Sequence, residues 1–328
     1  MTIKSFAKIN LGLEIIGKRP DGYHDIRTLF QWVDLWDDFE FRPLPSKDIR
    51  LRGNDPTIPW DETNLIFKAA KLLQARFGPP GGVEISVTKN IPAGRGLGGG
   101  SSNAATAIFT LARLWELGLS RDDMADLGKE LGADVAYFFF GGLCLGEERG
   151  DRLTELPDLP RLPVVLAFPP FPVSTALIYG ELDFSSLTSK AQHSKIMRFL
   201  ETRELGVLEN RLEDTIFRLY PQLRDYKSLF RNHGAELSLV TGSGSAVYGI
   251  FRDSGKAERC LADLRKRGAA VLVETVTRLQ GWNELEAGVS PSGKAADFGS
   301  AIRGFESSRP SFGPELRRNK RSRQRNRT

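Results

Sequence analysis

The chain has 328 residues, of which 40% are hydrophobic and 27% charged, with 33 glycines and 18 prolines. This composition is close to the globular average, so it excludes collagen-like, wholly disordered and membrane-spanning classes, and the length allows about two domains. The formal charge of +5 resides in residues 309–328, which carry seven Arg, one Lys and one Glu; without this +7 the remaining chain is −2. The basic balance therefore describes a tail and not the folded part.

The N-terminal residues indicate a cytoplasmic protein. Charged side chains recur through the first twenty positions, and no apolar run approaches the roughly 18 residues of a membrane helix, so neither a signal peptide nor a membrane partner is expected. The two cysteines, Cys144 and Cys260, lie far apart and match neither a metal-binding nor a redox spacing. We therefore expect buried, reduced thiols.

The first predicted elements are a strand, a helix and a second strand. Alternation predicts a strand over Ser5–Ile16, in which Lys8 and Asn10 lie side by side on the polar face. Apolar residues at helical spacing then run from the capping residues Asp61–Thr63 to a Gly-Pro-Pro stop. Val83–Thr88 alternates again and predicts a strand that leads into a glycine-rich segment.

Two further helices are predicted after the glycine-rich segment, one ending near Gly118 and one over Ser120–Leu131. The proline-rich passage Pro157–Pro163 predicts a boundary between two domains, residues 1–157 and 158–287. In the second domain helices and strands mix without strict alternation, which favours an α+β fold. Residues 288–328 are rich in Ser, Gly, Lys and Arg and predict a disordered basic tail.

The glycine-rich segment predicts a phosphate-binding loop. It places five glycines, then hydroxyl and amide side chains, between a strand and a helix, and helix N-termini offer unpaired N–H groups and a positive dipole end to a phosphate. Ser101, Ser102 and Asn103 could cap the helix or reach phosphate oxygens and Mg²⁺. The segment comprises Pro92, Ala93, Gly94, Arg95, Gly96, Leu97, Gly98, Gly99, Gly100, Ser101, Ser102 and Asn103.

Other nucleotide motifs fit less well. Gly94, Gly96 and Gly99 satisfy the G-x-G-x-x-G pattern of dinucleotide sites, but a second helix follows where a strand is required. The segment lacks the G-K-[ST] ending of a Walker A loop. Asp297-Phe298-Gly299 imitates a protein-kinase signature, yet it lies in the predicted tail without the partner motifs.

Three motifs in order resemble those of the GHMP kinases. The loop from Pro92 resembles the family's ATP loop, P-x-x-x-G-L-G-[GS]-G-S-S, the segment Ala7–Leu13 resembles its N-terminal motif, and Thr241–Val247 resembles its C-terminal glycine loop. The resemblance covers about residues 3–285. It implies a two-domain α+β fold, with an N-terminal domain like the second domain of ribosomal protein S5 and a ferredoxin-like C-terminal domain.

Two further segments narrow the resemblance. Arg19–His24, which contains Asp-Gly-Tyr-His, and Leu131–Val135 resemble the branch that phosphorylates the 2-hydroxyl of a cytidylated methylerythritol in isoprenoid biosynthesis. The resemblance implies ATP as co-substrate, Mg²⁺ assistance, and a small-molecule acceptor. The alternatives are a homoserine- or mevalonate-type kinase of the same family, whose substrates carry no cytosine, and a nucleic-acid-binding protein that uses the basic tail.

Site roles follow from the resemblance residue by residue. Asp134 is implied as the base that accepts the hydroxyl proton, and Lys8 as the cation that stabilises the transferring phosphoryl group and keeps Asp134 ionised. Taken alone, Asp134 is typical of a capping aspartate and Lys8 of a solvated strand lysine. The apolar neighbours of Asp134 suggest that desolvation tunes it.

The remaining implied ligands form two groups. On the acceptor side, His24 would hydrogen-bond cytosine and Tyr23 and Tyr179 would stack on it; Asn10 would bind the methylerythritol part, and Thr175 the cytidine end. On the ATP side, three residues match adenine-side positions: Asn64, Leu65 and Lys89. One departure is Arg95, where the family more often has a small residue, so its side chain is expected at a phosphate or in solvent.

Overall fold

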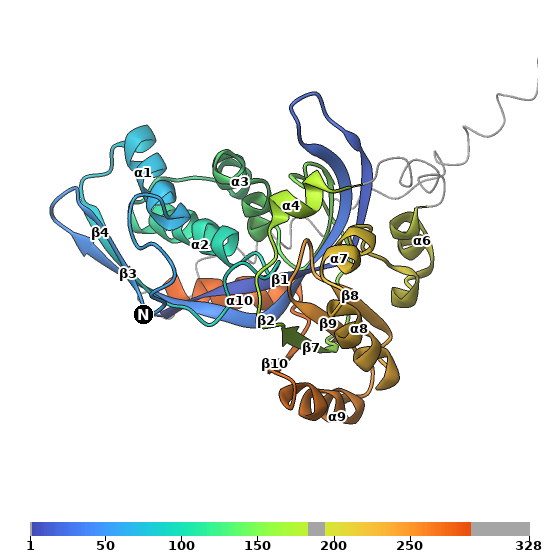
Figure 1. Cartoon of the computed structure of the whole chain (residues 1–328). Helices are drawn as coiled ribbons and strands as arrows, with labels where there is room; N and C mark the ends of the chain where they lie inside the picture. Colours follow the sequence, from blue (N-terminus) through green and yellow to red (C-terminus); the bar gives the residue numbers. More distant parts are fainter. Residues whose placement is uncertain (1, 183–193, 290–328) are drawn as a thin grey trace, which may run out of the picture. The chain divides into compact units, whose positions relative to one another are not determined.

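The computed structural model describes residues 2–182 and 194–289, and its longest elements are two antiparallel strands, β1 (Thr2–Lys18) and β2 (His24–Leu44). They are joined at a tight turn in which Asp21 Oδ1 accepts the backbone N–H of Tyr23 at 3.0 Å. The larger sheet has the order β3 (Ile49–Gly53), β4 (Gly82–Thr88), β2, β5 (Leu143–Glu148), β6 (Arg152–Glu155), with β1 paired to β2. The β1–β2 hairpin crosses the whole of this part of the protein (Figure 1).

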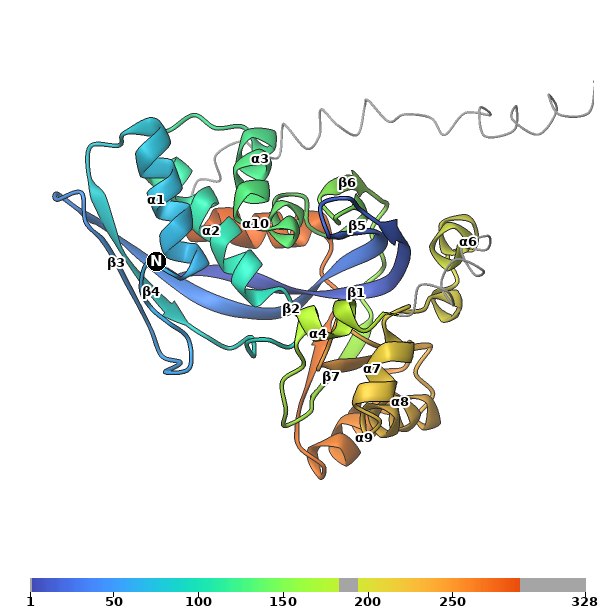
Figure 2. The same ribbon diagram turned by 45° about the horizontal axis from the view of Figure 1, so that its top comes forward.

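Three helices and a 3-10 helix lie between strands of the larger sheet in the chain: α1 (Leu65–Phe77) connects β3 to β4, and α2 (Gly99–Leu114), α3 (Arg121–Leu131) and η1 (Ala133–Phe139) connect β4 to β5. Helix α1 begins as predicted but is capped by Asn64, whose side chain accepts from Ile66 N at 2.9 Å, and not by the preceding Asp61–Thr63. Helix α3 has the predicted start at Ser120, which forms a reciprocal capping box with Asp123. Figure 2 shows α1, α2 and α3 together on one side of the hairpin.

The second half of the chain forms a smaller antiparallel sheet of order β10 (Ala269–Glu274), β7 (Pro163–Phe168), β9 (Val247–Ile250), β8 (Leu237–Val240). Helices α7, α8 and α9 gather around it (Figure 1). Mixed sheets with helices segregated in this way confirm the predicted α+β class. Its helical elements are α4 (Thr175–Gly180), α6 (Lys195–Thr202), η2 (Leu205–Val207), α7 (Glu213–Leu219), α8 (Leu223–Asn232) and α9 (Ser254–Arg265).

Strand β1 is buried on both faces. Ile9 and Leu11 belong to a core shared with Leu166 and Tyr248 of the smaller sheet, while Phe6 packs against Trp32 at a ring-centroid distance of 5.7 Å on the other face. The expectation of a solvated polar face is therefore wrong. Both Lys8 and Asn10 are only 3% exposed, because helices and loops cover that side of the strand. This shared core joins residues on both sides of the predicted boundary at 157/158, and the boundary itself stays a prediction.

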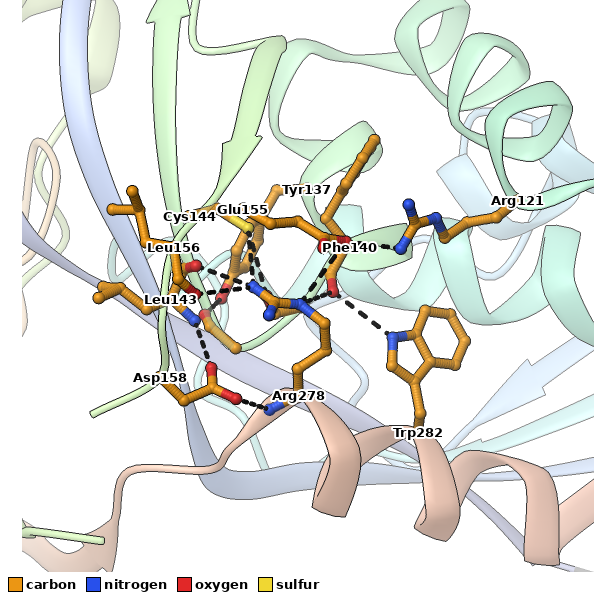
Figure 3. Close-up of polar contacts among 12 residues, drawn as sticks. Arg121, Tyr137, Phe140, Leu143, Cys144, Glu155, Leu156, Asp158, Arg278 and Trp282 are labelled. Carbon is orange, nitrogen blue, oxygen red and sulfur yellow. Dashed lines mark hydrogen bonds and ion pairs between the residues drawn. The ribbon is translucent and has the colours of Figure 1, made fainter. Parts of the chain in front are cut away.

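The last described helix, α10 (Arg278–Val289), packs on the larger sheet. Figure 3 shows the Arg278 guanidinium enclosed by backbone carbonyls: it donates to Phe140 O at 3.1 Å and to Leu143 O at 3.0 Å. Asp158 accepts the backbone N–H groups of Arg278 and Leu143 at 2.9 and 3.1 Å. The helix includes the first two residues of the predicted tail 288–328, and the rest of that tail lies outside the described residues.

Within the ranges 2–182 and 194–289, no helix combines the length and the apolar character needed to cross a membrane. Both cysteines are buried and unpaired, as predicted. Burial raises the pKa of the Cys144 and Cys260 thiols to about 12 each, so both remain protonated at neutral pH.

Candidate active site

The buried polar face of β1 carries the centre of the site. Lys8 Nζ donates to Asn10 Oδ1 at 2.6 Å, and Asn10 Nδ2 donates to Thr28 Oγ1 of the neighbouring strand at 2.8 Å. Thr28 Oγ1 in turn donates to Gly12 O at 2.8 Å. These bonds fix the ammonium group and the amide in one orientation, because each buried polar atom has a defined partner.

Asp134 faces this ammonium group from the first turn of η1. Its Oδ2 lies 3.5 Å from Lys8 Nζ, and the Lys8 side chain is 4% exposed. The Asp134 side chain is 39% exposed, whereas Val135 and Ala136 beside it are fully buried. The expectation of a desolvated carboxylate is therefore wrong: the apolar neighbours point into the core, and the carboxylate remains open to an incoming ligand.

The phosphate loop reaches the site from the other side. Lys8 N donates to Leu97 O at 2.9 Å, so the loop pairs with the strand that carries the lysine. Gly98 has φ +69 and precedes the first turn of α2; a Cβ there would lie 2.9 Å from the Lys8 side chain. Only glycine permits both this backbone conformation and this approach. The free N–H groups at the start of α2 consequently lie beside the Lys8 side chain.

The two glycine loops contact each other. Thr241 Oγ1 donates to Gly96 O at 3.1 Å, and Ala246 N donates to Arg95 O at 3.2 Å. A Cβ on Gly96, where φ is +78, would lie 2.2 Å from Thr241 O. Thr241 Oγ1 also accepts from Asn10 N at 3.1 Å. The three motifs, far apart in the sequence, thus form one continuous site.

Several predicted ATP ligands have other partners. Ser102 and Asn103 are buried, with Ser102 Oγ 2.7 Å from Ser5 Oγ and Asn103 Nδ2 donating to Asp37 Oδ2 at 2.8 Å. The Lys89 ammonium group is paired with Asp37 and donates to Asn103 Oδ1 at 3.0 Å. Among the polar side chains at the start of α2, the partly exposed Ser101 remains open to a ligand.

Arg95 points neither to a phosphate nor to solvent. Its guanidinium donates to Pro169 O at 2.6 Å and Ser245 Oγ at 2.7 Å, and it contacts Phe171 O as well. This side chain therefore ties the phosphate loop to the second half of the chain. On the adenine side, Asn64 caps α1, and Leu65 lies 4.0 Å from the Cβ position of Gly100, so α1 and α2 begin next to each other.

The predicted aromatic residues gather at the β1–β2 turn. The rings of His24 and Tyr179 lie 5.2 Å apart at an interplanar angle of 32°, while Tyr23 is 55% exposed with the Arg149 guanidinium 4.2 Å above its ring. Burial lowers the pKa of His24, helped by the charge of Lys18, so the imidazole is neutral at neutral pH. Burial, and to a lesser extent the charge of Asp134, raise the pKa of the Tyr179 phenol.

Comparisons with known proteins agree with this geometry. Models of the GHMP kinases N terminal domain and the GHMP kinases C terminal domain match residues 64–142 and 194–270. A 4-diphosphocytidyl-2-C-methyl-D-erythritol kinase from Lachnospira eligens is 38% identical over 277 residues, covering 83% of this chain and 96% of the relative. One from Syntrophus aciditrophicus is 41% identical over 269 residues, covering 82% and 96%.

The chain belongs to the 4-diphosphocytidyl-2-C-methyl-D-erythritol kinase family. A solved structure of a 4-(cytidine 5'-diphospho)-2C-methyl-D-erythritol kinase has a TM-score of 0.72 at 34% identity, covering 84% of this chain and 99% of that one. A homoserine kinase from Cytophaga hutchinsonii has a TM-score of 0.69 at 19% identity, covering 85% and 96%, which shows the fold alone. These findings confirm the resemblance and do not favour the homoserine or mevalonate alternative.

Sequence reasoning about this member of the 4-diphosphocytidyl-2-C-methyl-D-erythritol kinase family missed three site residues. Thr28 lies on β2, a strand that was not predicted, and only the strand pairing places its hydroxyl beside Asn10. Thr241 was placed in a motif but given no role. Arg149 follows β5 and approaches Tyr23 across the sheet, and nothing in the local sequence distinguishes it from other surface arginines.

Proposed function

We propose that the chain transfers the γ-phosphoryl group of ATP to the 2-hydroxyl of a cytidylated methylerythritol, giving the 2-phosphate and ADP. The observation that carries this proposal is the position of the Lys8 ammonium group. It lies 3.5 Å from Asp134 Oδ2 and 2.6 Å from Asn10 Oδ1, and the carbon chain that carries it packs against Gly98 of the phosphate loop. A fixed cation between a carboxylate and a phosphate-binding helix N-terminus suits phosphoryl transfer, where positioning and charge stabilisation dominate.

ATP would lie on the phosphate loop with its phosphates at the first turn of α2. The first-turn N–H groups have no partner within the helix, and the positive end of the helix dipole favours the phosphate charge. Gly99, Gly100 and Ser101 present these groups at a partly exposed surface. Asn64 and Leu65, at the neighbouring start of α1, mark the side on which the adenine would bind.

Mg²⁺ fits this site as a phosphate-bound ion. Within the described part of the chain no cluster of three or more His, Cys, Asp and Glu side chains is suited to hold a metal. Mg²⁺ commonly takes one or two carboxylates and completes its shell with phosphate oxygens and water. The partly exposed Ser101 hydroxyl at the start of α2 is the group that would hold it beside the phosphate oxygens, and the ion would neutralise charge on the phosphates.

The reaction needs a proton acceptor and a cation. The Asp134 carboxylate would accept the proton of the acceptor hydroxyl while the hydroxyl oxygen bonds to the γ-phosphorus. The bond between the γ-phosphorus and the oxygen that bridges it to the β-phosphate breaks, which releases ADP. Lys8 would stabilise the charge on the transferring group, because its ammonium is held in place before the reaction begins. The bond from Lys8 to Asn10 sets the direction of that ammonium.

The aromatic residues account for an acceptor with a nucleobase. The rings of His24 and Tyr179 lie together, and Tyr23 directly precedes His24 in the chain. A neutral imidazole offers one donor and one acceptor to a cytosine edge. The Arg149 guanidinium above Tyr23 supplies a positive charge for the diphosphate of such an acceptor.

Thr175 is held at the second glycine loop, because its Oγ1 lies 2.7 Å from Oγ of Ser243 within that loop. Free buried thiols also suit a cytoplasmic enzyme.

An ATP-coupled assay tests the proposal. The purified chain is expected to consume ATP with the cytidylated alcohol and not with mevalonate or homoserine. Asp134→Ala should lower kcat by about 100-fold or more while leaving Mg·ADP affinity within about twofold. Asp126→Ala is the matched control, because Asp126 is 73% exposed on α3 and forms a surface ion pair with Lys129. Full activity of Asp134→Ala would refute its role as the base.

A further inference from the structure

One buried carboxylate outside every motif holds both ends of the phosphate loop. Asp37, on β2, has no exposed surface. Its Oδ1 accepts the backbone N–H groups of Asn90 at 2.7 Å and Ile91 at 2.8 Å, the two residues before Pro92. Its Oδ2 accepts from Asn103 Nδ2 at 2.8 Å, near the start of α2. The segment between these two points is the loop that grips the phosphates.

The polar side chains around Asp37 bond to one another. The Lys89 ammonium pairs with Asp37 and donates to Asn103 Oδ1, and its side chain is 6% exposed. Asn103 Nδ2 also donates to Ser5 Oγ at 3.0 Å, and Ser5 Oγ lies 2.7 Å from Ser102 Oγ. Lys89 and Asn103 are two of the residues predicted to bind ATP. Their partners show that they act on the loop's ends.

We propose that Asp37 is a positioning residue that sets the distance between the two ends of the phosphate loop, and that Lys89 and Asn103 serve it and do not bind the nucleotide. The inference rests on the proposed function, since it assumes that ATP phosphates lie on this loop. A carboxylate suits this task, because it can accept several short bonds at once from groups on different segments. An amide in its place keeps the shape but turns two N–H donors toward Lys89 and Asn103.

The proposal predicts different effects on nucleotide binding and on acceptor binding. The Lys8 ammonium is held by Asn10, and Asn10 is held by Thr28 and Thr241; none of these bonds is made to Asp37. Loosening the loop's ends should therefore weaken nucleotide binding and leave acceptor binding unchanged. A residue with a purely structural role would lower the melting temperature without separating the two ligands.

The experiment compares Asp37→Asn with Asp38→Asn. Asp38 is the next residue and accepts from the Asn90 side chain at 3.2 Å and Trp36 Nε1 at 3.1 Å, so its variant controls for charge removal at the same strand. Titration calorimetry with Mg·ADP is expected to show about 10-fold weaker binding for Asp37→Asn and a change within about twofold for Asp38→Asn. The KM for the cytidylated acceptor should stay within about twofold in both variants.

A second variant keeps the test possible if Asp37→Asn does not fold. Asp37→Asn combined with Lys89→Met removes both buried charges. Replacing both members of a buried ion pair by neutral groups destabilises a protein less than removing one member and leaving the other charge unpaired. Mg·ADP affinity equal to that of the unmodified chain, in Asp37→Asn or in the double variant if only that one folds, overturns the proposal. So does an equal loss for both ligands. Failure of the proposed function looks different: the unmodified chain would bind Mg·ADP yet not phosphorylate the cytidylated alcohol.

Discussion

The two glycine loops of the site are held by similar chemistry in different surroundings. At the phosphate loop, Asp37 accepts backbone N–H groups and pairs with Lys89; at the loop 241–245, Glu213 accepts Val240 N at 2.8 Å and pairs with Lys227. Asp37 is sealed in the core and binds both ends of its loop. Glu213 binds one end and lines, with Lys227, a cavity of about 690 Å³.

The same end of loop 241–245 is also held by an amide. Asn210 Nδ2 donates to Val240 O at 2.9 Å and Gly242 O at 2.7 Å, and the segment before Asn210 pairs with β1 at Leu13. The first loop is therefore anchored at both ends by one fully buried carboxylate, and the second at one end by a carboxylate and an amide, the carboxylate bordering the cavity. We expect the donor side of the site to be rigid and the acceptor side to adjust more easily.

The largest expected difference lies in folding stability. Asp37→Asn leaves the Lys89 ammonium buried without its carboxylate and should lower the free energy of unfolding by about 3–5 kcal/mol. Glu213→Gln should cost about 1 kcal/mol, because Lys227 borders the cavity and can turn toward water. Urea unfolding of both variants measures the difference. Equal losses would contradict the comparison.

The pH dependence sharpens the same contrast. Burial raises the pKa of Glu213 above its ordinary value of 4.5, an effect that Lys227 opposes. The Glu213 carboxyl group thus binds its proton more tightly in the folded chain than in the unfolded chain. Protonated Glu213 therefore stabilises the fold below about pH 4.5, and this stabilisation declines as the pH rises through the pKa of the folded state. The Glu213→Gln variant should therefore gain stability relative to the unmodified chain as pH rises toward neutrality.

The contact between the loops is tested by adding one methyl group. In Gly96→Ala the new Cβ would lie 2.2 Å from Thr241 O, so the two loops must separate. We expect kcat/KM to fall by about 100-fold, since displacements of about 1 Å misalign the reacting groups. Gly94→Ala is the control: its φ of +68 carries the same backbone strain, but nothing lies within 4 Å of the added atom. Equal losses in both would assign the effect to strain alone.

A smaller effect is expected at the second loop's amide anchor. Asn210→Ala removes the bonds to Val240 O and Gly242 O and should lower kcat by about tenfold, because Thr241 loses its fixed place against Asn10. Mg·ADP affinity should not change. Asn232→Ala, at the exposed end of α8, is the matched control. A fall in nucleotide affinity for Asn210→Ala would show that the loops are not anchored independently.

The smallest signal comes from the two thiols, one in each half. Cys144 on β5 and Cys260 on α9 are buried with pKa values of about 12, so neither should react with a thiol reagent at neutral pH on the assay timescale. Both should react in denaturant. Asn210→Ala should speed labelling of Cys260 and leave Cys144 unchanged, as read by mass spectrometry, if the two regions open separately. Rapid labelling of both in the unmodified chain would contradict the burial.

The sequence predicted those parts of the fold that local pattern determines. The alternation of β1 and the capping of α3 at Ser120 predicted their elements to within a few residues. Helix α10 escaped prediction because it contains Gly281 and Gly288, each of which costs a helix about 1 kcal/mol. Both glycines are required by contacts elsewhere: a Cβ on Gly281 would lie 2.3 Å from the Trp32 ring, and one on Gly288 would lie 2.9 Å from Thr2 O.

In the site, too, local motifs predicted some features, and contacts between distant segments determine the others. The motifs indicated Lys8, Asp134, His24 and Tyr179, and the structure brings them together in two pairs, Lys8 with Asp134 and His24 with Tyr179. The motif could not distinguish residues that face a ligand from residues that support the loop. Asn103 is bound to a carboxylate 66 positions earlier in the chain, and that separation leaves no local signal.

The position of Arg278 affects the order in which the protein can be assembled during synthesis. The carbonyls of Phe140 and Leu143 that it caps belong to segments made much earlier, and Trp282 completes the packing around Trp32 and Phe109. Domains usually fold as the ribosome releases them, beginning with the N-terminal one. We therefore expect the first half to leave the ribosome without the side chains that complete its core, and to finish folding once Arg278 and Trp282 have emerged.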